Sequence, residues 1–268
     1  MSTPVRAVDK PSRFPVFVVG SARSGTSILL STLRTAGYSG FAEGNFLSLI
    51  SVLDRDVDKH FATFRRDVPQ LLMSRIDRDG LKAALARVLV AEVERQQQGG
   101  PWVDKTGGAE MIRAIPTLRS ILPTSCYIFA KRRAIENIVS RVRKFPAQDF
   151  EFHCMAWAQT MTAWRKLRQD HPDTPGMEID QQDISTAPKA AARRIAAFLD
   201  LSPAAELIVE QSFTRNRPQQ TAPGSTDRIL SLDEVPWSAA EVATFHRHCD
   251  AEMAIYGYSC DNTYRVAA

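Results

Sequence analysis

Long hydrophobic runs are missing from this sequence. No part of its 268 residues approaches the roughly 18 consecutive apolar residues that a membrane-spanning helix requires. The apolar run at 14–19 follows a polar segment and is too short for the core of a secretory signal peptide. We therefore expect a chain without a membrane segment and without a membrane partner.

Cysteine is scarce, and its spacing excludes two kinds of site. No CxxC pair occurs, and the four cysteines lie far apart, at Cys126, Cys154, Cys249 and Cys260. This spacing indicates free thiols in a reducing compartment, so we expect a cytoplasmic protein. His246 and His248 stand beside Cys249, but residues two apart on a helix do not face each other. We therefore expect no metal site.

Basic and acidic residues are nearly balanced in number. Lys and Arg total 34 against 30 acidic residues, which gives a net charge of +4. This excess suits an anionic ligand but is too small to indicate a nucleic acid partner. A chain of this length can bury a core without disulfide or metal crosslinks. We expect one domain over residues 1–268, and its oligomeric state, monomer or homodimer, stays open.

Short apolar runs alternate with amphipathic segments along most of the chain. The apolar runs predict buried strands at 14–19, 127–130 and 177–179. The amphipathic segments predict helices at 26–36, 134–144, 152–168 and 189–199. Strands separated by helices indicate an α/β fold with three layers around a central parallel sheet.

Two regions depart from this alternation. Residues 44–98 have a helical pattern, and we expect a helical insert that covers one end of the sheet. Residues 212–234 are polar and rich in turn-forming residues, which predicts a flexible loop. Beyond it, Ser238 and Glu241 form a capping box for a last helix that ends at Gly257.

The segment Gly20-Ser-Ala-Arg-Ser-Gly-Thr-Ser27 lies between the first strand and the first helix. Its position and glycine spacing are typical of a P-loop, whose backbone N–H groups surround a phosphate at a helix N-terminus. The Walker A motif has a lysine after its second glycine, where this chain has Thr26, and the cation here is Arg23 instead. The residues expected to bind the phosphate are Ser21, Ala22, Arg23, Ser24, Gly25, Thr26 and Ser27.

A second basic site follows the strand at 127–130, which ends in Lys131, Arg132 and Arg133. A nucleotide triphosphatase needs a magnesium-binding acid at a strand end, and these cations would repel magnesium. Arg132 can make a forked contact to a phosphate, and Ser140 on the next helix adds a hydroxyl. A P-loop kinase or hydrolase with a degenerate loop, and a binding module without catalysis, stay open as alternatives.

The loop, together with Arg132 and Ser140, resembles the sulfotransferases that use 3′-phosphoadenosine 5′-phosphosulfate (PAPS). In that family such a loop holds the 5′-phosphosulfate, and an arginine with a serine eight residues later holds the 3′-phosphate. The resemblance implies a P-loop NTPase-like sulfotransferase fold, PAPS as donor, adenosine 3′,5′-bisphosphate (PAP) as product, and no metal. Ala134 departs from the pattern, because the family usually has proline there.

Other segments extend the resemblance to the tyrosylprotein and carbohydrate branches of the family. Residues 102–106 look like its Asp/Asn-Lys-Thr segment, and 183–201 like one of its scaffold helices. Residues 225–227 and 256–258 are similar to the C-terminal part of these branches. Ser225, in the loop at 212–234, is a further candidate, as a hydroxyl that reaches the phosphosulfate.

Sulfuryl transfer requires a base for the acceptor proton and cations for the leaving phosphate oxygen. Arg23 and Lys105 are the expected cations. We expect Glu43 to be the base, because it follows the first helix near the carboxyl edge of the sheet, where ligands bind in open α/β folds. His60 and His153 are alternatives, since other branches use histidine. The hydroxyl-bearing acceptor stays open: a peptide tyrosine, a carbohydrate or a small natural product.

Overall fold

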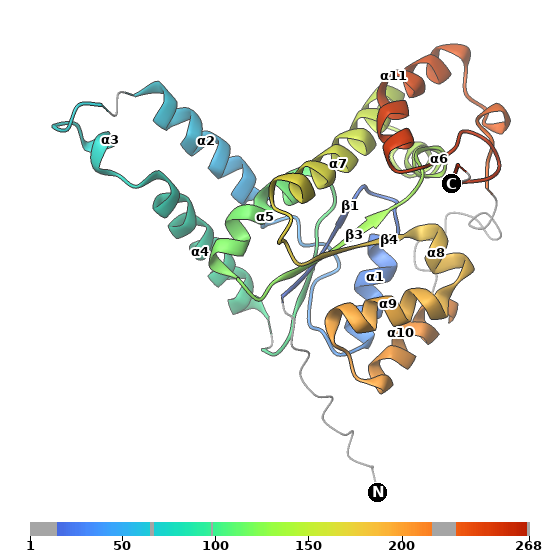
Figure 1. Cartoon of the computed structure of the whole chain (residues 1–268), viewed down its shortest axis with the longest axis horizontal. Helices are drawn as coiled ribbons and strands as arrows, with labels where there is room; N and C mark the ends of the chain where they lie inside the picture. The colour runs from blue at the N-terminus through green and yellow to red at the C-terminus, as the bar shows by residue number, and fades with distance from the viewer. Residues whose placement is uncertain (1–14, 65–66, 98, 216–228, 267–268) are drawn as a thin grey trace, which may run out of the picture.

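The computed structural model describes residues 15–64, 67–97, 99–215 and 229–266. Its centre is a sheet of four parallel strands in the spatial order β2-β1-β3-β4 (Figure 1). The strands are β1 (Val16–Gly20), β2 (Val103–Lys105), β3 (Cys126–Lys131) and β4 (Gly176–Asp180). The expected parallel sheet is confirmed, and β2 is a further strand of only 3 residues.

Helices cover both faces of this sheet and form the expected three layers (Figure 1). One layer holds α1 (Thr26–Thr35), α8 (Gln181–Thr186), α9 (Pro188–Leu199) and α10 (Pro203–Arg215). The other holds α5 (Ala109–Ile121), α6 (Ala134–Lys144), α7 (Phe150–Asp170) and α11 (Ala239–Ile255). Alternate strand residues supply the two cores, because neighbouring side chains of a strand point to opposite faces: Val16 and Val18 pack on the first layer, Phe17 and Val19 on the second.

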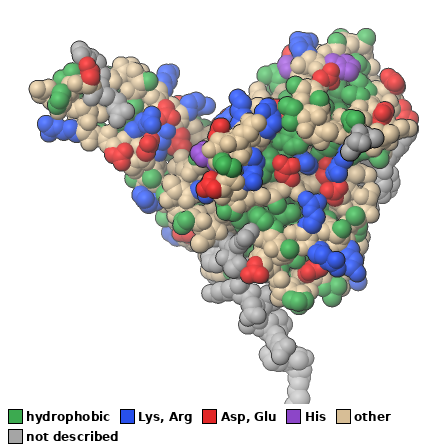
Figure 2. Space-filling view, viewed as in Figure 1, with side chains coloured by type: hydrophobic (Ala, Val, Ile, Leu, Met, Phe, Trp, Pro, Cys, Tyr) green, Lys and Arg blue, Asp and Glu red, His purple; other side chains and the backbone are tan. Residues whose placement is uncertain are grey.

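The helical insert lies to one side of the sheet. Its helices are α2 (Leu49–Thr63), α3 (Leu72–Arg75) and α4 (Arg78–Gln96). Figure 1 shows that they extend away from α5 as an arm, in place of the expected cover over one end of the sheet. Charged side chains of both signs coat this arm (Figure 2), among them Asp58 between Arg78 and Lys82. Few of the described arm residues reach the core: Ile50 of α2, and Ala86 and Val90 of α4.

The described parts of the region expected to be a flexible loop, 212–234, include helical residues at both ends. Its first residues, 212–215, form the last turn of α10, where Ser212 and Phe213 are buried. Near its end, Leu232–Glu234 form a short 3₁₀ helix, η1. Residues 216–228 lie outside the described residues. The capping box is confirmed, because Glu241 N donates to Ser238 Oγ at 3.3 Å.

The end of β1 is built around a close approach of two backbones. Gly20 pairs with Ala130 of β3 and has φ +147°, and a Cβ on it would lie 2.2 Å from the Ala130 carbonyl oxygen. Only glycine fits there, so the strand can turn into the loop beside β3 without steric conflict.

We expect Gly20→Ala to lower the free energy of unfolding by about 1–3 kcal/mol more than Gly37→Ala, because its methyl group overpacks the sheet. Gly37 is a matched control, with φ +105° but nothing within 4 Å of its Cβ position. Urea unfolding of both variants measures the difference. Equal losses would show that backbone strain alone, and not the contact with β3, requires glycine at position 20.

Across the described ranges, every helix is too short or too polar to span a bilayer. All four cysteines are free thiols, as the sequence predicted.

Candidate active site

The candidate site lies where β1, β2 and β3 end. β1 is flanked by β2 on one side and β3 on the other, so the chain leaves the carboxyl edge here in two directions. Such a divergence opens a crevice above the sheet in α/β folds. The loop at 20–27, Lys105 at the end of β2, and Arg132 after β3 all lie at this edge.

The loop after β1 presents the N-terminus of α1 to the crevice. Arg23 and Gly25 both have positive φ, +74° and +92°, which curls the loop tightly. Gly25 is the N-cap and makes no side-chain cap, and the first turn of α1 contains no acidic residue. The N–H groups of this turn have no partner within the helix, and they carry its partial positive charge. The loop therefore has the geometry of an anion-binding site.

Asn137 of α6 holds the loop in this shape. Its Nδ2 donates to the Ala22 carbonyl at 3.0 Å and to Ser24 Oγ at 2.9 Å, and Ser21 Oγ donates to its Oδ1 at 3.4 Å. The hydroxyls of Ser21 and Ser24 thus help to fix the conformation of the loop through Asn137. Sequence reasoning missed Asn137, although it lies three residues before Ser140 on the same helix face, which was a usable signal.

Two guanidinium groups meet on the α6 side of the loop. Arg23 Nε donates to Ser140 Oγ at 2.9 Å, and Arg132 Nη1 donates to the Arg23 carbonyl at 3.3 Å. Arg132 Nε is buried without a hydrogen-bond partner among the described residues. Burial lowers the pKa of both guanidinium groups, and the charge of Arg23 lowers the pKa of Arg132 further. Arginine stays protonated in proteins, so these two charges favour an anion between them.

The other two cations at the end of β3 have different partners. Lys131 Nζ donates to Glu178 Oε2 at 2.7 Å. Arg133 is fully buried, where it pairs with Glu136 and donates to the Ser259 carbonyl at 3.2 Å. Arg133 therefore fastens the C-terminal segment to the sheet, and of the three consecutive cations it is Arg132 that reaches the loop.

Glu43 and Lys105 meet on the opposite side of the loop. Lys105 Nζ donates to Glu43 Oε1 and, at 3.2 Å, to Ser27 Oγ. The Lys105 side chain is 4% exposed and that of Glu43 51%, so the carboxylate lies between the buried ammonium and solvent. Gly44 N donates to the Lys105 carbonyl at 2.9 Å, which fixes the segment with Glu43 along β2. The structure thus brings Glu43 and Lys105 together, while Arg23 lies toward Ser140.

Asp104 is a second carboxyl group close to this pair, and sequence reasoning did not select it. Its Oδ2 accepts from Thr106 Oγ1 at 2.8 Å, and Thr106 Oγ1 accepts from Asn45 N at 2.9 Å. Burial raises the pKa of Asp104 to about 6. The negative charge of Glu43 also raises this pKa, whereas the hydrogen bond from Thr106 lowers it. The available signal was the Asp-Lys-Thr run at 104–106, which resembles a family segment and whose first two residues lie in β2.

Stability should fall as pH rises through the titration of Asp104. In the unfolded chain its pKa is about 4, so from there to its folded pKa of about 6 the folded state binds more protons. The free energy of unfolding should therefore fall by up to about 3 kcal/mol more in the wild type than in Asp104→Asn. Urea unfolding of both proteins from pH 4 to pH 7 measures it, and an identical pH dependence would contradict the raised pKa.

The alternative bases and the last predicted ligand lie elsewhere. His60 is exposed in the last turn of α2, with its ring 4.7 Å from that of Phe64. His153 is buried in α7, where its ring lies against the backbone of Phe145. Burial lowers the pKa of His153. Neither histidine has a hydrogen bond to the loop, Glu43 or Lys105 in the part of the chain that the structure describes. Ser225 lies outside the described residues.

Known proteins resemble this chain in sequence and in fold. A model of the sulfotransferase family matches residues 15–205. No curated protein matches the sequence. The sulfotransferase domain of the Synechococcus PCC 7002 olefin synthase has a TM-score of 0.55 and 15% identity, over 96% of this chain and 99% of that one. Sulfotransferase STF9 from Mycobacterium avium has a TM-score of 0.52 and 13% identity, over 91% and 78%. At such identities these structures show a shared fold.

Proposed function

This chain belongs to the sulfotransferase family, and we propose that it transfers a sulfuryl group from PAPS to a hydroxyl group of an acceptor. The family predicted from the sequence is confirmed. The proposal concerns three points: PAPS as the donor, Glu43 as the base, and a hydroxyl-bearing molecule as the acceptor.

The observation that carries the choice of donor is the second cation site beside the phosphate-binding loop. PAPS has phosphate groups at both the 3′ and the 5′ position, so it needs two anion sites on one surface. Arg132, whose buried Nε has no partner among the described residues, and Ser140 supply one site next to the loop. A buried guanidinium N–H without a partner is costly unless a ligand pairs with it. The residues present therefore fit the 3′-phosphate, and the loop fits the 5′-phosphosulfate.

In the proposed reaction Glu43 accepts the proton of the acceptor hydroxyl while the hydroxyl oxygen attacks sulfur. The bond between sulfur and the 5′-phosphate oxygen breaks, and its electron pair stays on that oxygen of PAP. Lys105 supplies positive charge for this oxygen, and its present contact with Glu43 keeps base and cation at one centre. Arg23 adds positive charge on the donor side.

The experiment that tests this function follows PAP formation from PAPS by chromatography, with phenols, sugars and tyrosine peptides as acceptors. We expect PAP to form only when both protein and an acceptor are present, and to form equally in EDTA. Binding of PAP without turnover by any acceptor would favour a binding module. Turnover of ATP that requires magnesium would favour a kinase.

A further inference from the structure

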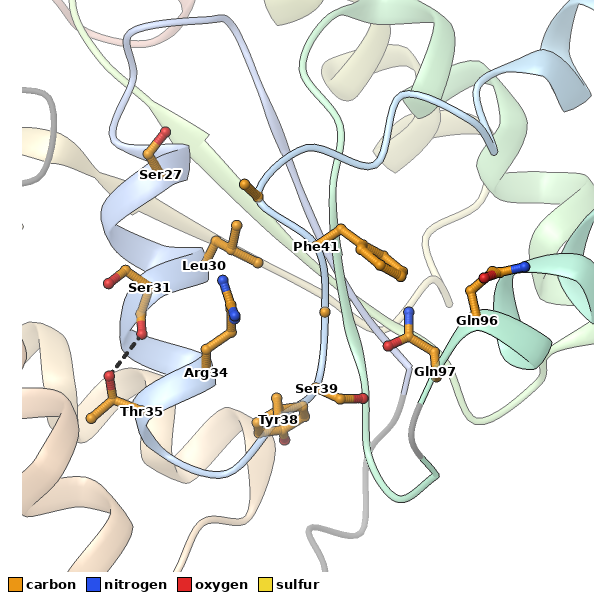
Figure 3. Close-up of a pocket in the computed structure, with 12 residues that line it drawn as sticks. Ser27, Leu30, Ser31, Arg34, Thr35, Tyr38, Ser39, Phe41, Gln96 and Gln97 are labelled. Carbon is orange, nitrogen blue, oxygen red and sulfur yellow. Dashed lines mark hydrogen bonds between the residues drawn. The ribbon is translucent and has the colours of Figure 1, made fainter.

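A cavity of about 630 Å³ runs along one side of α1 (Figure 3). One wall is the face of α1 that carries Ser27 and Arg34, and the other is the segment 38–42. Gln97, just beyond α4, closes the far side. The proposed phosphate sites at the loop and at Arg132 do not include this cavity, and the proposed reaction gives it no role.

One end of the cavity reaches the proposed catalytic centre. Ser27 lines it and accepts a hydrogen bond from Lys105 Nζ at 3.2 Å. Ala42 lines it as well and directly precedes Glu43. A molecule in the cavity therefore has one end beside the proposed base and cation, as an acceptor hydroxyl requires.

Among the described residues that line the cavity, Arg34 alone carries a charge. Figure 3 shows its guanidinium directed into the space between α1 and the segment 38–42. Arg34 makes no ion pair with another described residue, and the lining holds no carboxylate. The side chain is exposed, so an incoming anion can reach it.

The helix fixes the spacing of the Ser27 and Arg34 backbones along the cavity. Arg34 follows Ser27 by seven residues, which places both on one face of α1. At 1.5 Å per residue the two positions are about 10 Å apart along the helix. Phe41 also lines the cavity, and its ring lies on the side of the segment 38–42 that faces Gln96 and Gln97, where it offers an apolar contact (Figure 3).

We propose that this cavity is the acceptor site and that Arg34 binds an anionic group of the acceptor. The substrate class is a small hydroxyl-bearing acid whose carboxylate, or other anion, stands within about 10 Å of the reacting hydroxyl. This inference rests on the proposed function, and it distinguishes such acids from neutral sugars and from neutral phenols.

The test measures binding of 4-(4-hydroxyphenyl)butanoate and of its neutral amide by calorimetry, with and without saturating PAP. The wild type should bind the acid at least about tenfold more tightly than the amide, as expected for a charge-assisted hydrogen bond. Arg34→Gln should abolish this preference, and Arg34→Lys should restore part of it. PAP affinity should stay unchanged in both variants.

Arg87→Gln is the matched control, because it removes an exposed arginine of α4 that does not line the cavity. It should leave the preference intact. Equal binding of acid and amide, no binding of the acid, or an equal effect of Arg87→Gln would overturn the acceptor assignment. If the wild type does not bind PAP, the proposed function is overturned instead. The comparison of acid and amide without PAP then still shows whether the cavity binds the acid.

Discussion

Glu43→Gln is expected to lower kcat for sulfuryl transfer by about a hundredfold to ten-thousandfold, the range that general-base catalysis contributes. Glutamine keeps a hydrogen-bond acceptor for the buried Lys105 ammonium, so the segment along β2 should hold its position. Because Glu43 lies on the side of the loop opposite Arg132, PAP affinity should change by no more than a few-fold. Rate assays with PAPS and calorimetry with PAP measure the two effects separately.

His60→Ala is the control for this prediction, since His60 lies on the arm and has a ring contact with Phe64. Its turnover should match that of the wild type. If Glu43→Gln or Glu43→Ala retains most of the wild-type turnover, the base is another residue. A large loss in His60→Ala would then identify the histidine as that base.

Arg132→Ala is expected to weaken PAP binding by about tenfold to a hundredfold, the loss of a charge-assisted hydrogen bond. Its guanidinium has a buried Nε that no described residue satisfies, so a ligand phosphate gains a hydrogen bond that the protein does not already make. Calorimetry with PAP measures the change. Adenosine 5′-monophosphate, which lacks the 3′-phosphate, should bind the variant and the wild type alike.

Lys131→Ala is the matched control, because it removes the neighbouring cation, which is paired with Glu178. It should leave PAP affinity nearly unchanged. Equal losses in Lys131→Ala and Arg132→Ala would mean that only the overall positive charge matters at this strand end. A loss of adenosine 5′-monophosphate affinity in Arg132→Ala would place that residue at the 5′ side.

The strand, loop and helix at residues 16–35 could be predicted because their signals are local. A continuous apolar run indicates a buried strand, and the glycines mark the turn into the helix. The pairing of the loop with residues 132–140 was also predictable, since parallel strands place their carboxyl ends at one edge. For the same reason Glu43 could be chosen before its contact with Lys105 was known, whereas Lys105 was chosen from the resemblance of residues 102–106 to a family segment.

The remaining features depend on contacts between distant segments. Nothing in three consecutive cations indicates that Arg133 is buried against the C-terminal segment while Arg132 reaches the loop. β2 has too few residues for a periodic pattern, so Asp104 could not be placed beside Glu43. The insert was recognised as helical, but the direction of the arm depends on packing against α5, which its own sequence does not state.

The most direct measurement for the whole account is a calorimetric comparison of two nucleotides, PAP in EDTA and ATP with magnesium. Two adjoining anion sites, one made by the loop at 20–27 and one by Arg132 and Ser140, predict that PAP binds one to one without metal and more tightly than ATP. Tight, magnesium-dependent binding of ATP with no measurable binding of PAP would contradict it.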